Sequence, residues 1–314
     1  MSHRGTADET SVTHPVARCN GPCRFRWRPG RSRGQTDAVL TLRGDRPLPA
    51  GWDPDVPPGR TALVATEDDE TMAALVVREE QGVVNGSQVW FAPGAETPER
   101  AAALVDALVA QDPDATAVTL EVEPDHPTLL AALHDAPVLG HAMSKPVADP
   151  PPPLPPGYGY RPMTEDEYTA WHEDHVRSYA EDGIARTGGN RELAYERARA
   201  DFARYLPDGL ATADHSIVVL TQDGAPVGSL WLGHHRDGVT FGFDFEIDAD
   251  KRGRGLGRAG MAVGEHLAAR AGDRELGLHV FGDNTVARTL YLSCGFRVTG
   301  TNLDLLGRRR AAPA

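Results

Sequence analysis

The segment Arg252-Gly253-Arg254-Gly255-Leu256-Gly257 constrains this chain more than any other stretch of its sequence. It follows Thr240–Ile247, where apolar and polar residues alternate as in a strand, and it precedes a run with the apolar period of a helix. A glycine-rich turn that enters a helix lets backbone N–H groups approach a phosphate, and the helix dipole adds partial positive charge. Arg252, Arg254 and Arg258 add full charges. The segment predicts a pyrophosphate-binding loop, with a glycine-rich surface turn as the plain alternative.

Two common phosphate-binding loops do not fit this segment. A Walker A loop needs a lysine directly after its last glycine, whereas Lys251 precedes the glycines. A dinucleotide-binding loop needs a third glycine at the position where Arg258 stands. The pattern is R-x-x-G-x-G instead.

A second pattern follows about 30 residues later. Glu275–Val280 predicts a strand, Asn284 predicts the cap of a short helix, and Gly295-Phe296 predicts its end. The run from Asn284 to Phe296 fits N-x-x-A-x-x-L-Y-x-x-x-G-F. In this order and spacing, the two patterns resemble the acetyl-CoA loop and the last motif of the GNAT superfamily of N-acetyltransferases. The resemblance covers about residues 158–305, including a strand over Tyr160–Thr164 and a capping box over Thr164–Glu167.

The resemblance implies a fold and a set of roles. The fold is mixed α/β, a central and mostly antiparallel sheet flanked by helices. The co-substrate is acetyl-CoA, with no metal. Backbone around Ile247 would bind the pantetheine arm, Asn284 would bind the arm or its water, and Tyr291 would be the general acid toward sulfur. The residues expected to bind the pyrophosphate are Arg252, Gly253, Arg254, Gly255, Leu256, Gly257 and Arg258.

Acetyl transfer to an amine also needs a base, because an amine with a pKa near 10 is under about 1% neutral at pH 7. Asp244 and Glu246 alternate with Phe241, Phe243, Phe245 and Ile247, so the two carboxylates are expected to share one strand face. Either carboxylate, directly or through water, is a candidate base, and two solvated strand carboxylates are the alternative.

Two histidine-bearing segments are candidates for a role in the site. His172 and His175 stand three apart on a predicted helix, which is weak evidence for a metal without a third ligand. A helix lining the acceptor cleft, or surface histidines, is the simpler interpretation. His234-His235 follows a strand ending at Leu232 and is interpreted as a turn.

Residues 35–146 carry the same order of elements as residues 241–303. Strands are expected over Gln88–Phe91, Ala117–Val122 and Leu139–Met143, with helices over Pro98–Ala110 and Pro127–His134. The two halves align without gaps, so that Val122 falls on Val280 and Leu133 on Tyr291. We interpret this as an internal repeat of two tandem GNAT-like copies, against an unrelated small domain. Gly94–Pro98 replaces the arginine-glycine loop and His126 replaces Asn284, which predicts a degenerate, non-catalytic first copy.

Composition sets the remaining expectations. The 314 residues allow two domains, and no apolar run approaches the length of a membrane span, which favours a cytoplasmic protein. A net charge of −13 disfavours nucleic-acid binding. Cys19 and Cys23 could bind zinc with His14 or another ligand, but without a second paired motif the signal is weak, and two cysteines in a flexible leader are the simpler interpretation. The expected organisation is 1–34 a disordered basic leader, 35–146 a degenerate domain, 147–157 a proline-rich linker, 158–308 the catalytic domain and 309–314 a tail.

The sequence thus predicts an N-acetyltransferase that moves an acetyl group from acetyl-CoA to a primary amine by direct attack in a ternary complex. No cysteine is placed as an acyl carrier, and Cys294 is expected in the core. The partner is a small-molecule or peptide amine, without nucleic acid or membrane, and a homodimer is left open. The alternative is a non-catalytic acyl-CoA-binding regulatory or interaction module.

Overall fold

The computed structural model describes residues 38–80, 82–187, 190–236 and 238–307. The expected leader with Cys19 and Cys23, and the expected tail over 309–314, lie outside the described residues. Within the described ranges, no helix is long and apolar enough to cross a membrane.

Among the residues that the structure describes, the first half of the chain contains six strands and two helices. They are β1 (Thr41–Arg43), β2 (Arg60–Glu67), β3 (Glu70–Glu80), β4 (Val83–Phe91), α1 (Pro98–Val109), β5 (Ala117–Val122), α2 (Pro127–Ala132) and β6 (Val138–Pro146).

The second half adds six more strands and four α-helices. They are β7 (Tyr158–Pro162), α3 (Glu165–Thr187), α4 (Arg191–Tyr205), β8 (His215–Gln222), β9 (Ala225–Arg236), β10 (Val239–Ile247), α5 (Leu256–Ala271), β11 (Glu275–Phe281), α6 (Thr285–Ser293) and β12 (Arg297–Asp304). The predicted capping box starts α3, because Thr164 N donates to Glu167 Oε2 at 2.9 Å and Glu167 N donates to Thr164 Oγ1 at 3.3 Å.

All described strands form one sheet, in the order β1-β2-β3-β4-β5-β12-β6-β11-β10-β9-β8-β7. Each half contains one parallel pair, β4 with β5 and β10 with β11, and the other described pairings are antiparallel. The predicted fold class, a mostly antiparallel sheet flanked by helices, is confirmed. The element order β4-α1-β5-α2-β6 also recurs as β10-α5-β11-α6-β12, which confirms the repeat.

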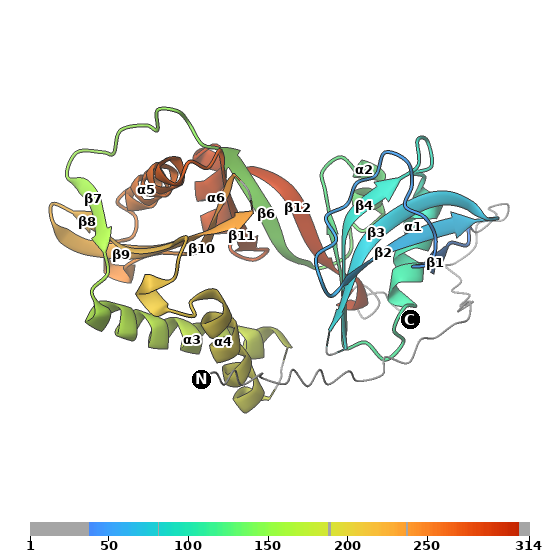
Figure 1. The fold of residues 1–314 in the computed structure, drawn as a ribbon, viewed down its shortest axis with the longest axis horizontal. Helices are drawn as coiled ribbons and strands as arrows, with labels where there is room; N and C mark the ends of the chain where they lie inside the picture. The colour runs from blue at the N-terminus through green and yellow to red at the C-terminus, as the bar shows by residue number, and fades with distance from the viewer. Residues whose placement is uncertain (1–37, 81, 188–189, 237, 308–314) are drawn as a thin grey trace, which may run out of the picture.

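The two halves exchange their last strands. β6 leaves the first half and pairs with β11 and β12, while β12 leaves the second half and pairs with β5 and β6. Figure 1 shows these two strands side by side between the two lobes. Cutting the chain near residue 150 would therefore remove a strand from each lobe. The sequence did not predict this exchange.

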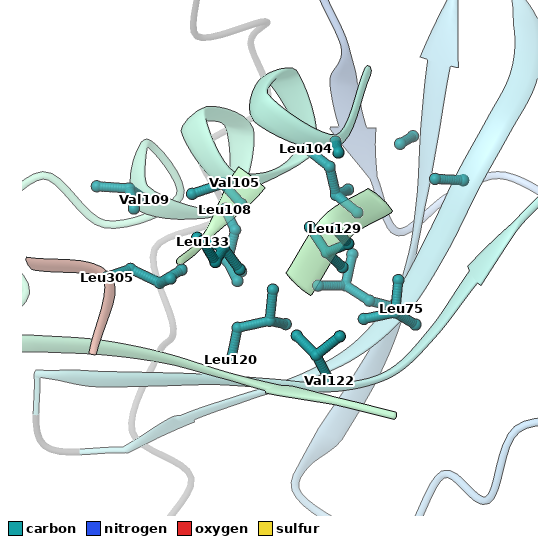
Figure 2. Packing of buried hydrophobic residues seen from close by; sticks show 14 of the residues in the cluster. Leu75, Leu104, Val105, Leu108, Val109, Leu120, Val122, Leu129, Leu133 and Leu305 are labelled. Carbon is teal, nitrogen blue, oxygen red and sulfur yellow. The ribbon is translucent and has the colours of Figure 1, made fainter. Parts of the chain in front are cut away.

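The exchanged strands also complete the core of the lobe that they enter. Leu303 of β12 and Leu305 just after it are buried in the first lobe, among residues of α1, α2 and β5. Figure 2 shows Leu305 beside the side chains of α1, close to Leu108 and Leu133. In return, Met143 of β6 is buried in the second lobe, in the cluster beneath α5. Burial of these side chains makes each lobe depend on the other for its apolar core.

A β-bulge at Phe243 divides β10. Gly242 pairs with Leu232 and Asp244 pairs with Trp231, so Phe243 is an extra residue without its own partner. Phe243 packs in the aromatic cluster beneath α3 and α4, whereas Phe245 packs in the cluster beneath α5. The bulge therefore reverses the faces in mid-strand, so that Phe243 and Phe245 lie on opposite faces although both alternate with polar residues in the sequence.

The turn predicted at His234-His235 is also wrong. β9 continues to Arg236, and His234 pairs with Thr240 of β10. The pairing with β10 extends the strand past Leu232, where the apolar run ends in the sequence. This correction moves the hairpin turn beyond both histidines.

Candidate active site

The predicted phosphate-binding loop leads directly into α5. Gly253 and Gly255 have φ angles of +78° and +80°, which favour glycine, and a Cβ on either would meet no atom within 4 Å. Gly255 caps α5 without a side-chain hydrogen bond, and no acidic residue stands in the first turn. No side chain therefore caps the first backbone N–H groups of α5, and an anion can bind at this helix start.

The three arginines of this loop differ in their partners. Arg252 Nε donates to the carbonyl oxygen of Ile247 at 2.8 Å, and its Nη2 lies 3.0 Å from Glu246 Oε1. Arg254 Nη2 donates to the Asp250 carbonyl oxygen at 3.3 Å. The side chain of Arg258 has no hydrogen-bond or ion-pair partner among the described residues. Arg254 and Arg258 are therefore the cations most available to an anion, while Arg252 braces the end of β10.

Gly257 serves the packing of two helices. A Cβ at this position would lie 2.9 Å from Leu290 Cδ2 of α6. Its small size thus lets α5 and α6 lie close together, as Figure 1 shows. Approach to a phosphate was the only role that the sequence suggested for this glycine.

A cavity opens where β10 and β11 separate. Their parallel pairing covers only Val239–Gly242 and Glu275–Leu278, and the bulge at Phe243 follows at once. The lining comes from β9, β10, β11, α5 and α6, and includes Asp244, Phe245, Asn284 and Tyr291. Three candidate residues of the sequence analysis, Asp244, Asn284 and Tyr291, therefore meet at one place.

Asn284 and Tyr291 stand at opposite ends of the short helix α6. Asn284 Oδ1 accepts a hydrogen bond from Ala287 N at 3.0 Å, as predicted for a helix cap. Tyr291 is buried, and its ring centroid lies 5.7 Å from that of Phe296. Burial, followed by the negative charge of Asp244, raises the pKa of Tyr291 to about 12. Its hydroxyl therefore keeps its proton at any physiological pH.

The two candidate carboxylates lie in different surroundings. Glu246 is half exposed and paired with Arg252, at the loop. Asp244 lines the cavity, and its Oδ2 lies 3.0 Å from Nε2 of His175 on α3. The charge of Asp244 also acts on Tyr291. Of the two carboxylates, Asp244 is therefore the one that shares the cavity with Tyr291.

His175 was not among the site residues expected from the sequence. Its contact with Asp244 spans 69 positions, and no sequence pattern indicates it. His172, one turn earlier, instead packs its ring at 5.3 Å from that of Phe202. In the part of the chain that the structure describes, no three His, Cys, Asp or Glu side chains gather to hold a metal ion.

The start of α1 in the first half differs from that of α5. Thr97 caps α1 by accepting a hydrogen bond from Arg100 N at 3.3 Å, and Glu99 places negative charge in the first turn. Arg100, which aligns with Arg258, is paired with Glu67 at 2.8 Å. The N–H groups and the arginine that are available in α5 are therefore occupied or shielded in α1.

The space between β4 and α2 is also closed. His126, which aligns with Asn284, places Nε2 at 2.8 Å from the carbonyl oxygen of Val89 and Nδ1 at 3.1 Å from Glu96 Oε2. Glu96 Oε1 accepts from the backbone N–H groups of Thr128 and Leu129, each at 3.1 Å. Leu133 replaces Tyr291 and is buried in the apolar core. Side chains of the first half thus fill the space that corresponds to the cavity of the second half.

Three comparisons with known proteins bear on this site. The model of the Acetyltransferase (GNAT) family matches residues 170–296. The N-acetyltransferase YycN of Bacillus subtilis is 31% identical over 142 residues, which cover 44% of this chain and 91% of YycN. A mycothiol acetyltransferase of Clavibacter sepedonicus is 29% identical over 257 residues, 76% of this chain and 78% of that protein.

Among solved structures, a GCN5-related N-acetyltransferase from Sphaerobacter thermophilus aligns with a TM-score of 0.50 and 19% identity. It covers 78% of this chain and 80% of that chain, and it supports the fold alone. Sequence, fold and loop geometry agree on one family. This chain belongs to the GNAT family of acetyltransferases and is an acyltransferase.

Proposed function

We propose that the second half, residues 158–308, is an N-acetyltransferase that transfers the acetyl group of acetyl-CoA to a primary amine. The observation that carries this proposal is that Tyr291 and Asp244 line one cavity in a GNAT chain. The amine attacks the thioester directly, with both substrates bound together. Cys294, the only cysteine that the structure describes, ends α6 and is not part of the cavity lining, so it offers no acyl carrier.

The residues around the loop suit the phosphate groups of acetyl-CoA. The uncapped N–H groups of α5, the open backbone at Gly253 and Gly255, and the side chains of Arg254 and Arg258 provide donors and positive charge. The Asn284 side chain keeps its amide N–H groups for the pantetheine arm, because its oxygen caps α6. Backbone near Ile247 is the second expected contact of that arm, beside the carbonyl oxygen that Arg252 holds. Bound acetyl-CoA supplies an activated acetyl thioester.

Tyr291 is the proposed proton donor to the departing sulfur. In the reaction a C–N bond forms as the C–S bond breaks, and the thiolate takes up a proton. The pKa of Tyr291, about 12, keeps its proton in place until the thiolate forms beside it. A thiol has a pKa of about 8.5, well below that of Tyr291, so full proton transfer from the tyrosine to the thiolate is unfavourable. The hydroxyl therefore acts mainly by a hydrogen bond to the sulfur, and the proton of the sulfur is then exchanged with water.

A carboxylate of β10 is the proposed acceptor of the amine proton. Asp244 lies in the cavity with Tyr291, whereas Glu246 is held by Arg252 at the loop. Asp244 is therefore favoured for direct contact with the amine, and Glu246 for a contact through water. Residues 35–146 are proposed to be a structural copy that contributes β6 and binds no acetyl-CoA.

The test is a panel of primary amines, peptides and aminoglycosides with acetyl-CoA and the full-length protein. Thiol release should depend on one class of amine, and mass spectrometry should find that amine heavier by one acetyl group. Tyr291→Phe is the control against background hydrolysis. Binding of acetyl-CoA without turnover for any acceptor would favour the regulatory acyl-CoA-binding module instead.

A further inference from the structure

We propose that His175 is a positioning residue of the acceptor site, which holds one oxygen of Asp244 and leaves the other directed at the ammonium group of the incoming amine. The inference rests on the acetyl transfer proposed above. It adds a residue from α3 to a site lined by β9, β10, β11, α5 and α6.

Both ring nitrogens of His175 face an oxygen that can only accept a hydrogen bond. Nδ1 lies 2.8 Å from the carbonyl oxygen of Trp171, and Nε2 lies 3.0 Å from Asp244 Oδ2. A neutral imidazole has one N–H, so only the doubly protonated ring satisfies both contacts. His175 is thereby suited to be a fixed cation beside a carboxylate.

The surroundings of His175 favour this charged form. Burial opposes the charge, but the hydrogen bond and charge of Asp244, the Trp171 carbonyl and the charge of Glu246 outweigh it and raise the pKa of His175. His172, one turn earlier on α3, is itself held toward the neutral form, because burial lowers its pKa. The ring of His175 is stacked on that of Trp171, with centroids 4.4 Å apart, and this contact favours the observed orientation of the ring.

Asp244 is held by one oxygen only. The bulge at Phe243 turns its side chain toward α3, where Oδ2 meets His175. No described residue hydrogen-bonds to Oδ1, and Asp244 lines the cavity with Tyr291. Because an amine with a pKa near 10 arrives as an ammonium ion, an ionised carboxylate with one open oxygen is a suitable receptor for it.

The contact is tested first without an acceptor, by NMR titration of the histidine rings in the full-length protein. The His175 midpoint should lie above the ordinary value of about 6.5 and should fall in Asp244→Asn. The His172 midpoint should stay below that value in both proteins, which makes it an internal control. A His175 midpoint that Asp244→Asn leaves unchanged would overturn the proposal.

The role is tested by kinetics with the amine identified in the panel. His175→Leu should raise the KM for the amine roughly tenfold or more, because Asp244 loses a charge-assisted hydrogen bond. The Kd for acetyl-CoA should stay within about twofold of the wild-type value. His175→Gln should recover part of the loss, since its amide donates to Asp244, and His172→Gln should resemble the wild type.

A merely structural His175 would give a different result. In that case His175→Leu would lower the thermal midpoint and weaken amine and acetyl-CoA alike, or change neither. If the wild type releases thiol with no amine, the proposed function and the acceptor role fail together. The NMR titration then still decides whether His175 and Asp244 are coupled, so the two failures are distinguishable.

Discussion

His126 Nε2 lies 2.8 Å from the carbonyl oxygen of Val89, and this contact closes in the first half the gap that is open in the second. The aligned residues of the second half are Asn284 and Ile247. In the second half, Asn284 caps α6, and Arg252 donates a hydrogen bond to the carbonyl oxygen of Ile247. Asn284 and Ile247 therefore form no such bridge. The same fold thus holds an open site in one copy and a closed one in the other.

Two glycines of α5 should respond in opposite ways to alanine. A Cβ at Gly260 would run into the ring of Phe245, whereas a Cβ at Gly264 would make an ordinary contact with Leu276 at 3.5 Å. We expect Gly260→Ala to destabilise the protein by about 1–3 kcal/mol through overpacking. Gly264→Ala should be neutral or stabilising by up to about 1 kcal/mol, because alanine favours a helix. Urea unfolding of both variants checks this, and equal shifts would contradict the packing described for Phe245.

Removal of the Tyr291 hydroxyl should slow the chemistry and spare binding. Tyr291→Phe should lower kcat by roughly 10²–10⁴, the usual contribution of a positioned acid. Because the pKa of Tyr291 is about 12, the group stays protonated and the ratio of the two rates should be constant between about pH 6 and pH 10. Calorimetry should find the same affinity for acetyl-CoA. A wild-type rate would mean that Tyr291 only packs against Phe296.

The two carboxylates of β10 should be separable by pH. As pH falls below the pKa of the amine, the free-amine fraction falls tenfold per unit, so a variant without its base should lose most activity at low pH. Asp244→Asn should show this loss more strongly than Glu246→Gln, because Asp244 is the carboxylate beside Tyr291. The measurement is kcat against pH for both variants. A larger low-pH loss in Glu246→Gln would transfer the role to Glu246.

The sequence predicted the elements whose signals are local. Asn284 caps α6, Gly295 follows the end of that helix with a positive φ, and α5 has apolar residues at the helical period. From these signals the bounds of β10, α5, β11 and α6 could be predicted within a residue or two. The bulge at Phe243 could not be predicted, because apolar and polar residues still alternate in the sequence across the extra residue. It depends on how β9 pairs, which is set by tertiary structure.

Contacts between distant segments were beyond sequence reasoning. The exchange of β6 and β12 depends on the sheet edge with which each strand pairs. The residue pattern of either strand is compatible with the sheet of either lobe. The His175–Asp244 contact likewise joins a helix and a strand 69 positions apart. The repeat, in contrast, was visible because two halves of one length keep the same order of elements.

The central claim is one acetyl-CoA site per chain, in the second half, and titration calorimetry of the full-length protein tests it most directly. The account predicts a stoichiometry of one. Arg258→Gln should weaken binding by roughly tenfold or more through loss of a charge-assisted contact. The matched variant Arg100→Gln should leave affinity unchanged, because Arg100 is paired with Glu67 at a capped helix. A stoichiometry of two, or weaker binding in Arg100→Gln than in Arg258→Gln, would contradict the account.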